Sequence, residues 1–187
     1  MGGRAARLAH LLHSIIADGA AVDLEALVVR KGRTAWTLFL DLTVLDHDGG
    51  LDDACALAAM AALSACRLPQ TELCTDGTVI VHNAADREPL PLTIQHVPLA
   101  ATFSLLGSAD DVVLDATRVE AAAAAGSVTV VRDRFAASTG EICAVHKSDG
   151  LGTSPTQLLR CAPDLVCNLL LHIFFTKVAS AIDCLVA

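Results

Sequence analysis

Charged residues are scarce in this chain of 187 residues, and basic ones are outnumbered. Charged side chains make up 18% of the sequence and hydrophobic ones 53%, a balance that favours a globular protein over a disordered one. Because 13 Lys and Arg face 21 Asp and Glu, the formal net charge is −8. Such a charge repels a phosphate backbone and argues against a protein that binds nucleic acid by itself. The apolar excess indicates surface that is buried against partners.

Long apolar runs are also lacking. The longest run near the end, residues 165–175, contains Asn168 and His172, so it is too short and too polar to span a bilayer. Polar residues likewise interrupt residues 1–19, for which we expect an amphipathic helix and not a signal peptide.

Paired cysteine motifs are missing too. The seven cysteines form an odd set without a C-x-x-C pair, and several fall within predicted apolar helices. This usage is typical of a reducing compartment in which thiols act as small core residues. The cysteines are Cys55, Cys66, Cys74, Cys143, Cys161, Cys167 and Cys184.

A strand, a turn and a helix in immediate succession are the clearest local signal that is present. Residues 36–45 alternate with a period of two, which predicts a long strand with one core face and one mixed face. The turn at residues 46–50, Asp-His-Asp-Gly-Gly, supplies residues that tolerate positive φ. The core face carries Trp36, Leu38, Leu40, Leu42 and Val44, and the mixed face carries Thr37, Phe39, Asp41, Thr43 and Leu45.

The helix after this turn carries no charge over residues 54–66. A helix that is apolar all round is buried on more than one side, and its alanines allow a sheet or a second helix to approach closely. We expect Asp52 or Asp53 to cap its first turn, and Arg67 and Pro69 to end it.

Shorter elements follow, and together they predict an α+β fold in packed layers. Asp76-Gly77 is a hairpin signal, and the proline-rich residues 84–98 suit a connector. We therefore divide the chain into a first part at residues 1–83, the connector at 84–98 and a second part at 99–187. Further strands are expected at residues 26–30, 72–75, 78–82, 100–106, 112–114, 127–132 and 141–146, and a closing helix over 165–178.

Seven stretches carry a family resemblance. They are AVDLEALVV at 21–29, DLTVLDHDGG at 41–50, DACALAAMAAL at 53–63, RLP at 67–69, DREPLPLTIQHVPLAATFSLLG at 86–107, VVLDATRVE at 112–120 and GEICAVHKSDG at 140–150. With them, nearly the whole chain resembles the ring subunits of the RNA exosome that have the ribonuclease PH fold, in particular their non-catalytic branch.

This resemblance implies two α+β halves. The first would be the later part of a ribosomal-S5-domain-2-like half, and the second the ribonuclease PH C-terminal domain. Family members begin with about another half-domain, which is missing before the helix at Arg4, so we expect a fragment or a gene model that starts late.

The resemblance also bears on catalysis. Active relatives attack RNA with phosphate and use a metal ion and a pair of aspartates six positions apart, after a strand. Here Asp115 matches the first position, but Ala121 stands at the second, and Glu120 is one residue out of place. The basic phosphate-holding loop has no match either. The subunit is therefore predicted to be catalytically silent, without a metal or cofactor; the alternative is a degenerate but active phosphorolytic exoribonuclease using phosphate and Mg²⁺.

Partners and cellular location follow from the same resemblance. It implies a hetero-hexameric ring with other ribonuclease PH-like subunits, cap subunits on the ring, and RNA passing through the assembled channel. The role would be support of 3′-to-5′ RNA degradation and processing, including rRNA maturation, in the nucleus, the nucleolus and the cytoplasm. A free-standing fragment outside any ring is the remaining alternative. Direct RNA contact is predicted weakly at Arg30, Lys31 and Arg33, for which a solvated turn is the favoured interpretation.

Other polar groupings carry less chemistry. The acidic turn at residues 46–53 lacks the glycine and carboxylate positions of a calcium loop. His10 and His13 lie one helical turn apart but lack further zinc ligands at a suitable spacing. The loop with Gly150 and Gly152 precedes a predicted helix and lacks the lysine of a P-loop, so a connecting loop is favoured over an anion site.

Overall fold

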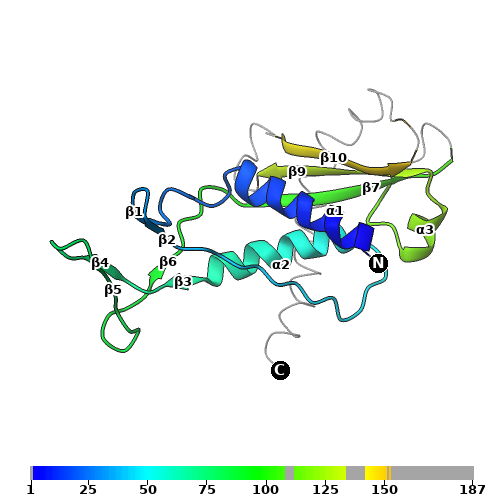
Figure 1. The fold of residues 1–187 in the computed structure, drawn as a ribbon. Helices are drawn as coiled ribbons and strands as arrows, with labels where there is room; N and C mark the ends of the chain where they lie inside the picture. The colour runs from blue at the N-terminus through cyan, green and yellow to red at the C-terminus, as the bar shows by residue number, and fades with distance from the viewer. Residues whose placement is uncertain (1, 108–111, 134–141, 151, 153–187) are drawn as a thin grey trace.

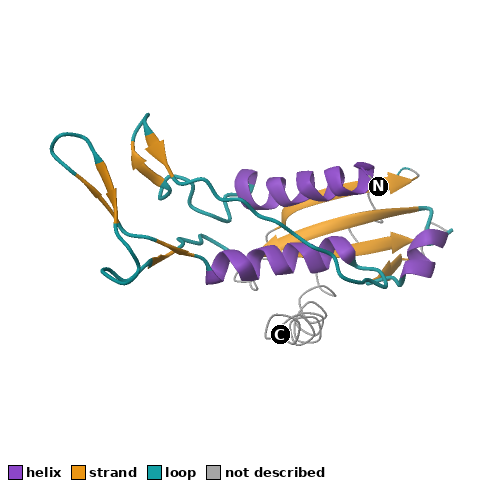
Figure 2. Cartoon of the chain, turned by 60° about the horizontal axis from the view of Figure 1, so that its bottom comes forward, coloured by secondary structure: helices purple, strands orange, loops and turns teal. Residues whose placement is uncertain are grey.

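Two helices and a four-stranded sheet form the body of the protein. The computed structural model describes residues 2–107, 112–133, 142–150 and 152. Helix α1 (Gly2–His13) runs into a π-helical turn, η1 (Ser14–Asp18), and α2 (Leu51–Ala65) is the longer helix. Figures 1 and 2 show α1 and α2 side by side across the sheet. The sheet is antiparallel, in the order β10-β9-β7-β8, and consists of β7 (Pro98–Leu105), β8 (Val112–Leu114), β9 (Gly126–Asp133) and β10 (Ile142–Gly150).

Alternation along the central strands divides the core in two. Ala100 of β7 and Val131 of β9 pack with apolar residues of α1 and α2. The neighbouring residues Ala101 and Phe103 point to the opposite face, where they cluster with Val128 and other residues of β9. Every second residue of a strand faces the same side, so both faces of this sheet are buried. The strands predicted at 100–106, 112–114, 127–132 and 141–146 are confirmed.

Three short antiparallel pairs extend from one end of the body. β1 (Val28–Arg30) pairs with β2 (Thr34–Ala35), β3 (Arg67–Leu68) with β6 (Leu90–Pro91), and β4 (Thr71–Leu73) with β5 (Val79–Val81). Figure 2 shows β1–β2 and β4–β5 projecting beyond the end of α2. The hairpin predicted around Asp76-Gly77 is confirmed, and Asp76 Oδ1 accepts a hydrogen bond from Thr78 N–H (2.8 Å).

The long strand predicted over residues 36–45 is wrong as a paired strand. Residues 36–47 belong to no helix or strand in the described part of the chain. The alternation itself is retained, because Trp36 and Leu38 pack on the cluster that contains Met60. Figure 2 shows this stretch crossing between α1 and α2. A strand requires hydrogen bonds to a neighbour, and a hydrophobic pattern alone does not supply them.

Helix α2 starts earlier than expected. Gly50 is its N-cap, in the left-handed region at φ 53°, and no side chain caps the helix. The predicted capping role of Asp52 or Asp53 is therefore wrong, since both lie inside the first turn. The uncharged stretch buries one side, with Ala56, Ala59 and Met60 in the core. Residues 58, 61, 62 and 65 are exposed along the other side, so the expected burial on more than one side is wrong.

The connector predicted at residues 84–98 contains β6 and a short extended stretch. Asp23 N–H donates to Thr93 O (3.1 Å), and Gln95 N–H donates to Ala21 O (2.9 Å), so the connector is held along the start of the chain. The domain boundary placed here stays a prediction. The turn expected at 138–140 and the helix expected at 165–178 lie outside the described residues.

Candidate functional site

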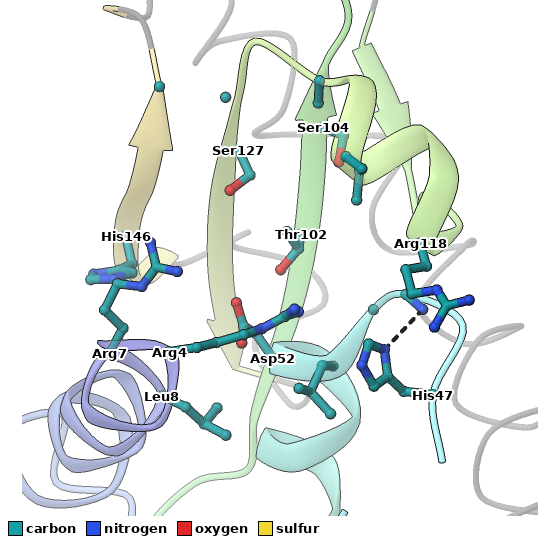
Figure 3. A pocket seen from close by; sticks show the side chains of 18 of the residues that line it. Arg4, Arg7, Leu8, His47, Asp52, Thr102, Ser104, Arg118, Ser127 and His146 are labelled. Atoms are coloured by element: carbon teal, nitrogen blue, oxygen red, sulfur yellow. Dashed lines mark hydrogen bonds between the residues drawn. The ribbon is translucent and has the colours of Figure 1, made fainter. Parts of the chain in front are cut away.

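A cavity of about 410 Å³ lies where the N-termini of α1 and α2 meet the sheet and α3 (Arg118–Ala123). Figure 3 shows side chains from all these elements around it. Three arginines line it, Arg4 and Arg7 from α1 and Arg118 from α3. The site thus depends on elements that are far apart in the sequence.

The charge of the cavity is mainly positive. His47 and His146 add two titratable imidazoles to the three arginines, and Asp52 is the one carboxylate among the described residues that line it. Its sheet wall is polar, with Thr102, Ser104 and Ser127. In a protein with a net charge of −8, this is a local concentration of cationic groups that is suited to an anion.

The turn before α2 is closely packed against the start of α3. Gly49 has φ 107°, and a Cβ at this position would collide with the carbonyl oxygen of Ala116. Arg118 N–H donates to Asp48 O (3.1 Å), and Gly49 N–H lies 3.5 Å from His47 Nδ1 (Figure 3). Only glycine fits this approach, so the Asp-Gly-Gly turn and the beginning of α3 form one rigid corner of the cavity.

A buried carboxylate supports the wall behind the cavity. Asp53 is 7% exposed, and its two oxygens accept hydrogen bonds from Thr102 N–H (2.8 Å) and Thr102 Oγ1 (2.6 Å). Thr102 Oγ1 in turn lies 2.8 Å from Thr129 Oγ1. This network ties α2 to β7 and β9. Sequence reasoning missed it; the available signal was an aspartate at the start of an otherwise uncharged helix, which was interpreted as a cap.

The three positions singled out for catalysis have different surroundings. Ala121 lines the cavity, and Asp115 is not among the described residues around it. Asp115 adopts a left-handed backbone (φ 54°), and its N–H donates to Thr102 O (3.4 Å). The structure thus places a methyl group at the cavity where the family resemblance requires the second carboxylate.

Glu120 is committed to a structural role. It forms a capping box with Thr117 at the start of α3: its Oε2 accepts from Thr117 N–H and from Thr117 Oγ1, both at 2.8 Å. These hydrogen bonds, first from the backbone and then from the side chain of Thr117, lower the pKa of the Glu120 carboxyl. Glu120 therefore caps a helix instead of replacing the missing carboxylate.

The chemistry of the cavity follows from these placements. Arginine and histidine can hold a phosphate group, but metal-assisted phosphoryl transfer also requires carboxylates to hold the metal. Among the described residues, no group of three or more His, Cys, Asp or Glu side chains is placed to bind a metal ion. The described lining of the cavity is suited to anion binding, and Asp52 is the carboxylate that it contains.

The predicted RNA-contact residues lie elsewhere, at the projecting end. Arg30 Nη1 donates to Gly77 O (2.7 Å), which joins the β1–β2 and β4–β5 hairpins. Lys31 and Arg33 are exposed in the turn between β1 and β2. Figure 1 shows that this end is opposite to α3, so the structure does not bring these residues to the cavity. Their contact with RNA stays a prediction.

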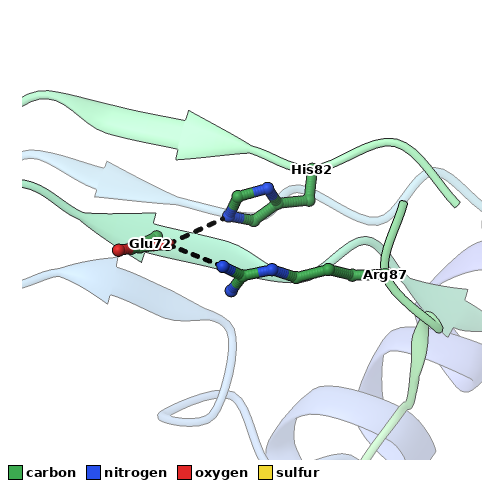
Figure 4. Close-up of polar contacts among 3 residues, drawn as sticks. All are labelled: Glu72, His82 and Arg87. Carbon is green, nitrogen blue, oxygen red and sulfur yellow. Dashed lines mark hydrogen bonds and ion pairs between the residues drawn. The ribbon is translucent and has the colours of Figure 1, made fainter.

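A second polar cluster lies on the same projecting hairpin. Glu72 accepts from Arg87 Nη2 (3.0 Å) and lies 3.2 Å from His82 Nε2, as Figure 4 shows. The Glu72 and Arg87 side chains are about half exposed, so these pairs contribute little to stability and mainly set the local shape.

Two features bear on location and thiol chemistry. No helix in the described ranges has the length and apolar character needed to cross a membrane. Cys55, Cys66 and Cys74 form no disulfide within the described part of the chain. Burial, followed by the nearby charge of Asp52, raises the pKa of the Cys55 thiol.

Comparison with known proteins gives consistent matches. Residues 3–69 match the 3′ exoribonuclease family, domain 1, and residues 96–162 match domain 2 of the same family. The chain is 36% identical to the exosome complex component RRP45A of Arabidopsis thaliana, over 86% of this chain and 52% of that protein. It is 37% identical to the exosome complex component Rrp42 of Thermococcus gammatolerans, over 79% of this chain and 50% of that protein.

A solved structure agrees with these matches. A chain of the Archaeoglobus fulgidus exosome with RNA bound to the active site is 28% identical, with a TM-score of 0.66, over 83% of this chain and 54% of that chain. The ribonuclease PH-like α+β fold is confirmed. Residues 86–107, which most resemble the subunit known as the polymyositis/scleroderma autoantigen, fit the confirmed similarity to RRP45-type ring subunits. The chain spans about half the length of these relatives.

Proposed function

We propose that this chain is a structural and catalytically silent subunit of an exosome ring. The premise is that it belongs to the 3′ exoribonuclease family with the ribonuclease PH fold. The observation that carries the proposal is the cavity at α3, where Ala121 takes the place of a carboxylate and arginines remain. A site of this kind retains charge for holding an anion and lacks the groups that activate a metal-bound nucleophile.

The partners proposed are other ribonuclease PH-like subunits in a hetero-hexameric ring, together with cap subunits and RNA passing through the channel. Similarity to exosome components of plant and archaeal origin supports this assembly. Exposed apolar side chains also support it, since Phe39, Leu45 and Val119 are each more than 70% exposed.

The cellular role proposed is support of 3′-to-5′ RNA degradation and processing, including rRNA maturation. We place it in the nucleus and nucleolus as well as the cytoplasm. Cys55, Cys66 and Cys74, which form no disulfide within the described part, fit a reducing compartment.

The second candidate function is phosphorolytic exoribonuclease activity with phosphate and Mg²⁺. It is favoured by the cationic cavity, which has the charge to hold a phosphate beside an RNA end. It is opposed by Ala121 at the cavity wall and by the capping role of Glu120.

The deciding experiment is an RNA phosphorolysis assay. Purified protein is incubated with 5′-labelled single-stranded RNA, phosphate and Mg²⁺, with an active exosome as positive control. We expect no release of nucleoside diphosphates above the buffer blank. Release that is abolished by Asp115→Ala would establish the enzyme and overturn catalytic silence.

Ring membership needs a separate measurement. The tagged chain is co-expressed with the other ring subunits, and the complex is analysed by size-exclusion chromatography and mass spectrometry. We expect co-elution with family members in fixed stoichiometry. A chain that elutes alone at every salt concentration would reject the ring assignment.

A further inference from the structure

Arg30 connects the two hairpins that project from the body of the protein. Its Nη1 donates a hydrogen bond to Gly77 O (2.7 Å), which lies 47 positions further along the chain in the turn of the β4–β5 hairpin. A Cβ at Gly77 would lie 2.7 Å from the same nitrogen, so the glycine leaves the space that the guanidinium occupies. The turn of one hairpin is thus held by the end of β1 in the other.

The β4–β5 hairpin depends on contacts of this kind. Its strands are short, and an isolated two-stranded hairpin is only marginally stable in water. Other bonds fix its base, because Glu72 accepts from Arg87 Nη2 (3.0 Å, Figure 4) and Gln70 Nε2 donates to Glu88 O (2.9 Å). Loss of the Arg30 bond is therefore expected to free the turn of the hairpin and to leave its base in place.

A cavity of about 230 Å³ lies between the segments that carry the two hairpins. The Arg30–Gly77 bond joins the two sides of this cavity, as does the bond from Asp23 N–H to Thr93 O (3.1 Å). Release of the first bond allows the sides to move apart at the end where the hairpins project. The lining residues are 26–29 and Trp36 on one side, and 68–71 and 90–93 on the other.

The acceptor of the Arg30 bond is neutral, although its surroundings are basic. Lys31 and Arg33 follow Arg30 in the chain and are exposed in the turn between β1 and β2. A guanidinium binds an anionic oxygen more strongly than a neutral one, and it pairs with a phosphate group through two parallel hydrogen bonds. A phosphate group that is attracted to this turn would therefore compete with Gly77 O for Arg30.

We propose that the Arg30–Gly77 bond is a latch that a phosphate-bearing anion releases. In the closed state, Arg30 holds the turn of the β4–β5 hairpin. In the open state, Arg30 binds the anion together with Lys31 and Arg33, and the cavity beside Trp36 widens. The inference rests on the contacts between the two hairpins and does not depend on catalytic silence or on ring membership.

The latch itself is tested by amide hydrogen exchange, measured by NMR on the full chain. The Cys74 amide reports the turn of the hairpin and the His82 amide its base, since each donates a backbone hydrogen bond across the hairpin (2.9 Å). Arg30→Ala should accelerate exchange at Cys74 about tenfold, the effect of losing one hydrogen bond from a charged donor, and should change His82 little.

A matched variant and an internal reference serve as controls. Lys31→Ala removes the same charge from the same turn and should leave exchange at Cys74 unchanged. The amides of β7 should stay protected in both variants, which shows that the body remains folded. Equal exchange at Cys74 in Arg30→Ala and in the unaltered chain would overturn the latch.

Release by an anion is tested with tripolyphosphate, with sodium chloride at equal ionic strength as the control for screening. Tripolyphosphate should accelerate exchange at Cys74 toward the rate of Arg30→Ala, and that variant should show no further acceleration. Lys31→Ala should require about threefold more tripolyphosphate, because one exposed ion pair with the anion is lost. Quenching of Trp36 by acrylamide should increase as the cavity opens, and Trp36 is the single tryptophan of the chain.

A titration with a single-stranded RNA hexamer distinguishes RNA phosphates from free polyphosphate as the releasing anion. Faster exchange at Cys74 with either anion supports the latch and identifies its source. Exchange that slows or stays unchanged at every concentration of both anions would overturn release by an anion. An acceleration that sodium chloride reproduces would also overturn it, since screening alone would then explain the effect.

Discussion

Strand β7 and residues 36–45 carry the same alternating pattern and reach opposite outcomes. β7 pairs with β8 on one side and β9 on the other, and its residue Phe103 is 6% exposed. Residues 36–45 have no partner strand among the described residues, and their residue Phe39 is 88% exposed. An alternating pattern of apolar residues is thus not sufficient for a stretch to become a buried strand.

The two stretches differ in the hydrogen bonds that their backbone N–H and C=O groups form. β7 exchanges hydrogen bonds with two neighbours, so its polar groups remain paired when both faces leave water. Residues 36–45 bury side chains mainly on one face, and their backbone joins no ladder within the described residues.

The largest expected effect compares the two phenylalanines directly. Phe103→Ala should lower the free energy of unfolding by about 4 kcal/mol, because it opens a cavity in the core of the sheet. Phe39→Ala should change it by less than about 0.5 kcal/mol, since the side chain is exposed. Urea denaturation monitored by circular dichroism measures both. Similar losses for the two variants would break the comparison and show that residues 36–45 are already part of the core.

The next effect concerns the link between α2 and the sheet. Asp53→Ala should cost about 3 kcal/mol, because it leaves Thr102 N–H without its buried acceptor. Asp52→Ala, one position away in the same helical turn, should cost less than about 1 kcal/mol, the usual size of a helix-dipole contribution. The same denaturation assay compares them. An equal cost would mean that charge near the N-terminus of α2, and not the hydrogen bonds to β7, is what matters.

A smaller effect is expected at the corner of the cavity. Gly49→Ala should cost about 2 kcal/mol, since its Cβ collides with the Ala116 carbonyl and φ is 107°. Gly32→Ala shares a positive φ of 73° but meets no atom within 4 Å, so about 1 kcal/mol is expected. Thermal unfolding of both variants separates collision from backbone strain. If Gly32→Ala costs as much as Gly49→Ala, backbone strain alone explains the glycines.

The smallest effect is the pH response of α3. Hydrogen bonds from Thr117 lower the pKa of the Glu120 carboxyl in the folded state. The stabilisation by this cap is therefore present above the pKa of the unfolded state and is lost as pH falls through the folded pKa. The protection factors of the α3 amides, corrected for the intrinsic exchange rate, should fall in acid while those of β7 stay high. Glu120→Gln should remove most of this pH dependence, and an unchanged profile in that variant would refute the assignment.

Prediction from the sequence succeeded for elements whose formation depends on residues close together in the chain. The uncharged stretch at 54–66 predicted a helix, and the Asp76-Gly77 turn predicted a hairpin; both are present. The predicted capping role of Asp52 or Asp53 was wrong. The Asp53 carboxylate instead accepts a hydrogen bond from Thr102 N–H of β7, which is 49 positions further along the chain. Rules based on neighbouring residues favour a helix cap, because they contain no information about partners that are distant in the sequence.

The candidate site was predictable only in part. The family resemblance predicted Ala121 in place of a second carboxylate, and Ala121 lines the cavity. The arginines of the cavity were not anticipated, since Arg4, Arg7 and Arg118 come from two helices that are more than 100 positions apart. Their common role depends on how α1 and α3 pack against the sheet.

The sequence by itself determined most of the helices and strands, the α+β class, the family resemblance and the presence of alanine at position 121, because each depends on residue type and short spacing. Tertiary structure alone decided which strands pair, that Asp53 is buried against β7, that three arginines share a cavity, and that residues 36–46 pair with no strand of the described part. The physical reason is that hydrogen-bond ladders and buried charges are settled between segments distant in the chain, where the cost of an unsatisfied polar group outweighs local preference.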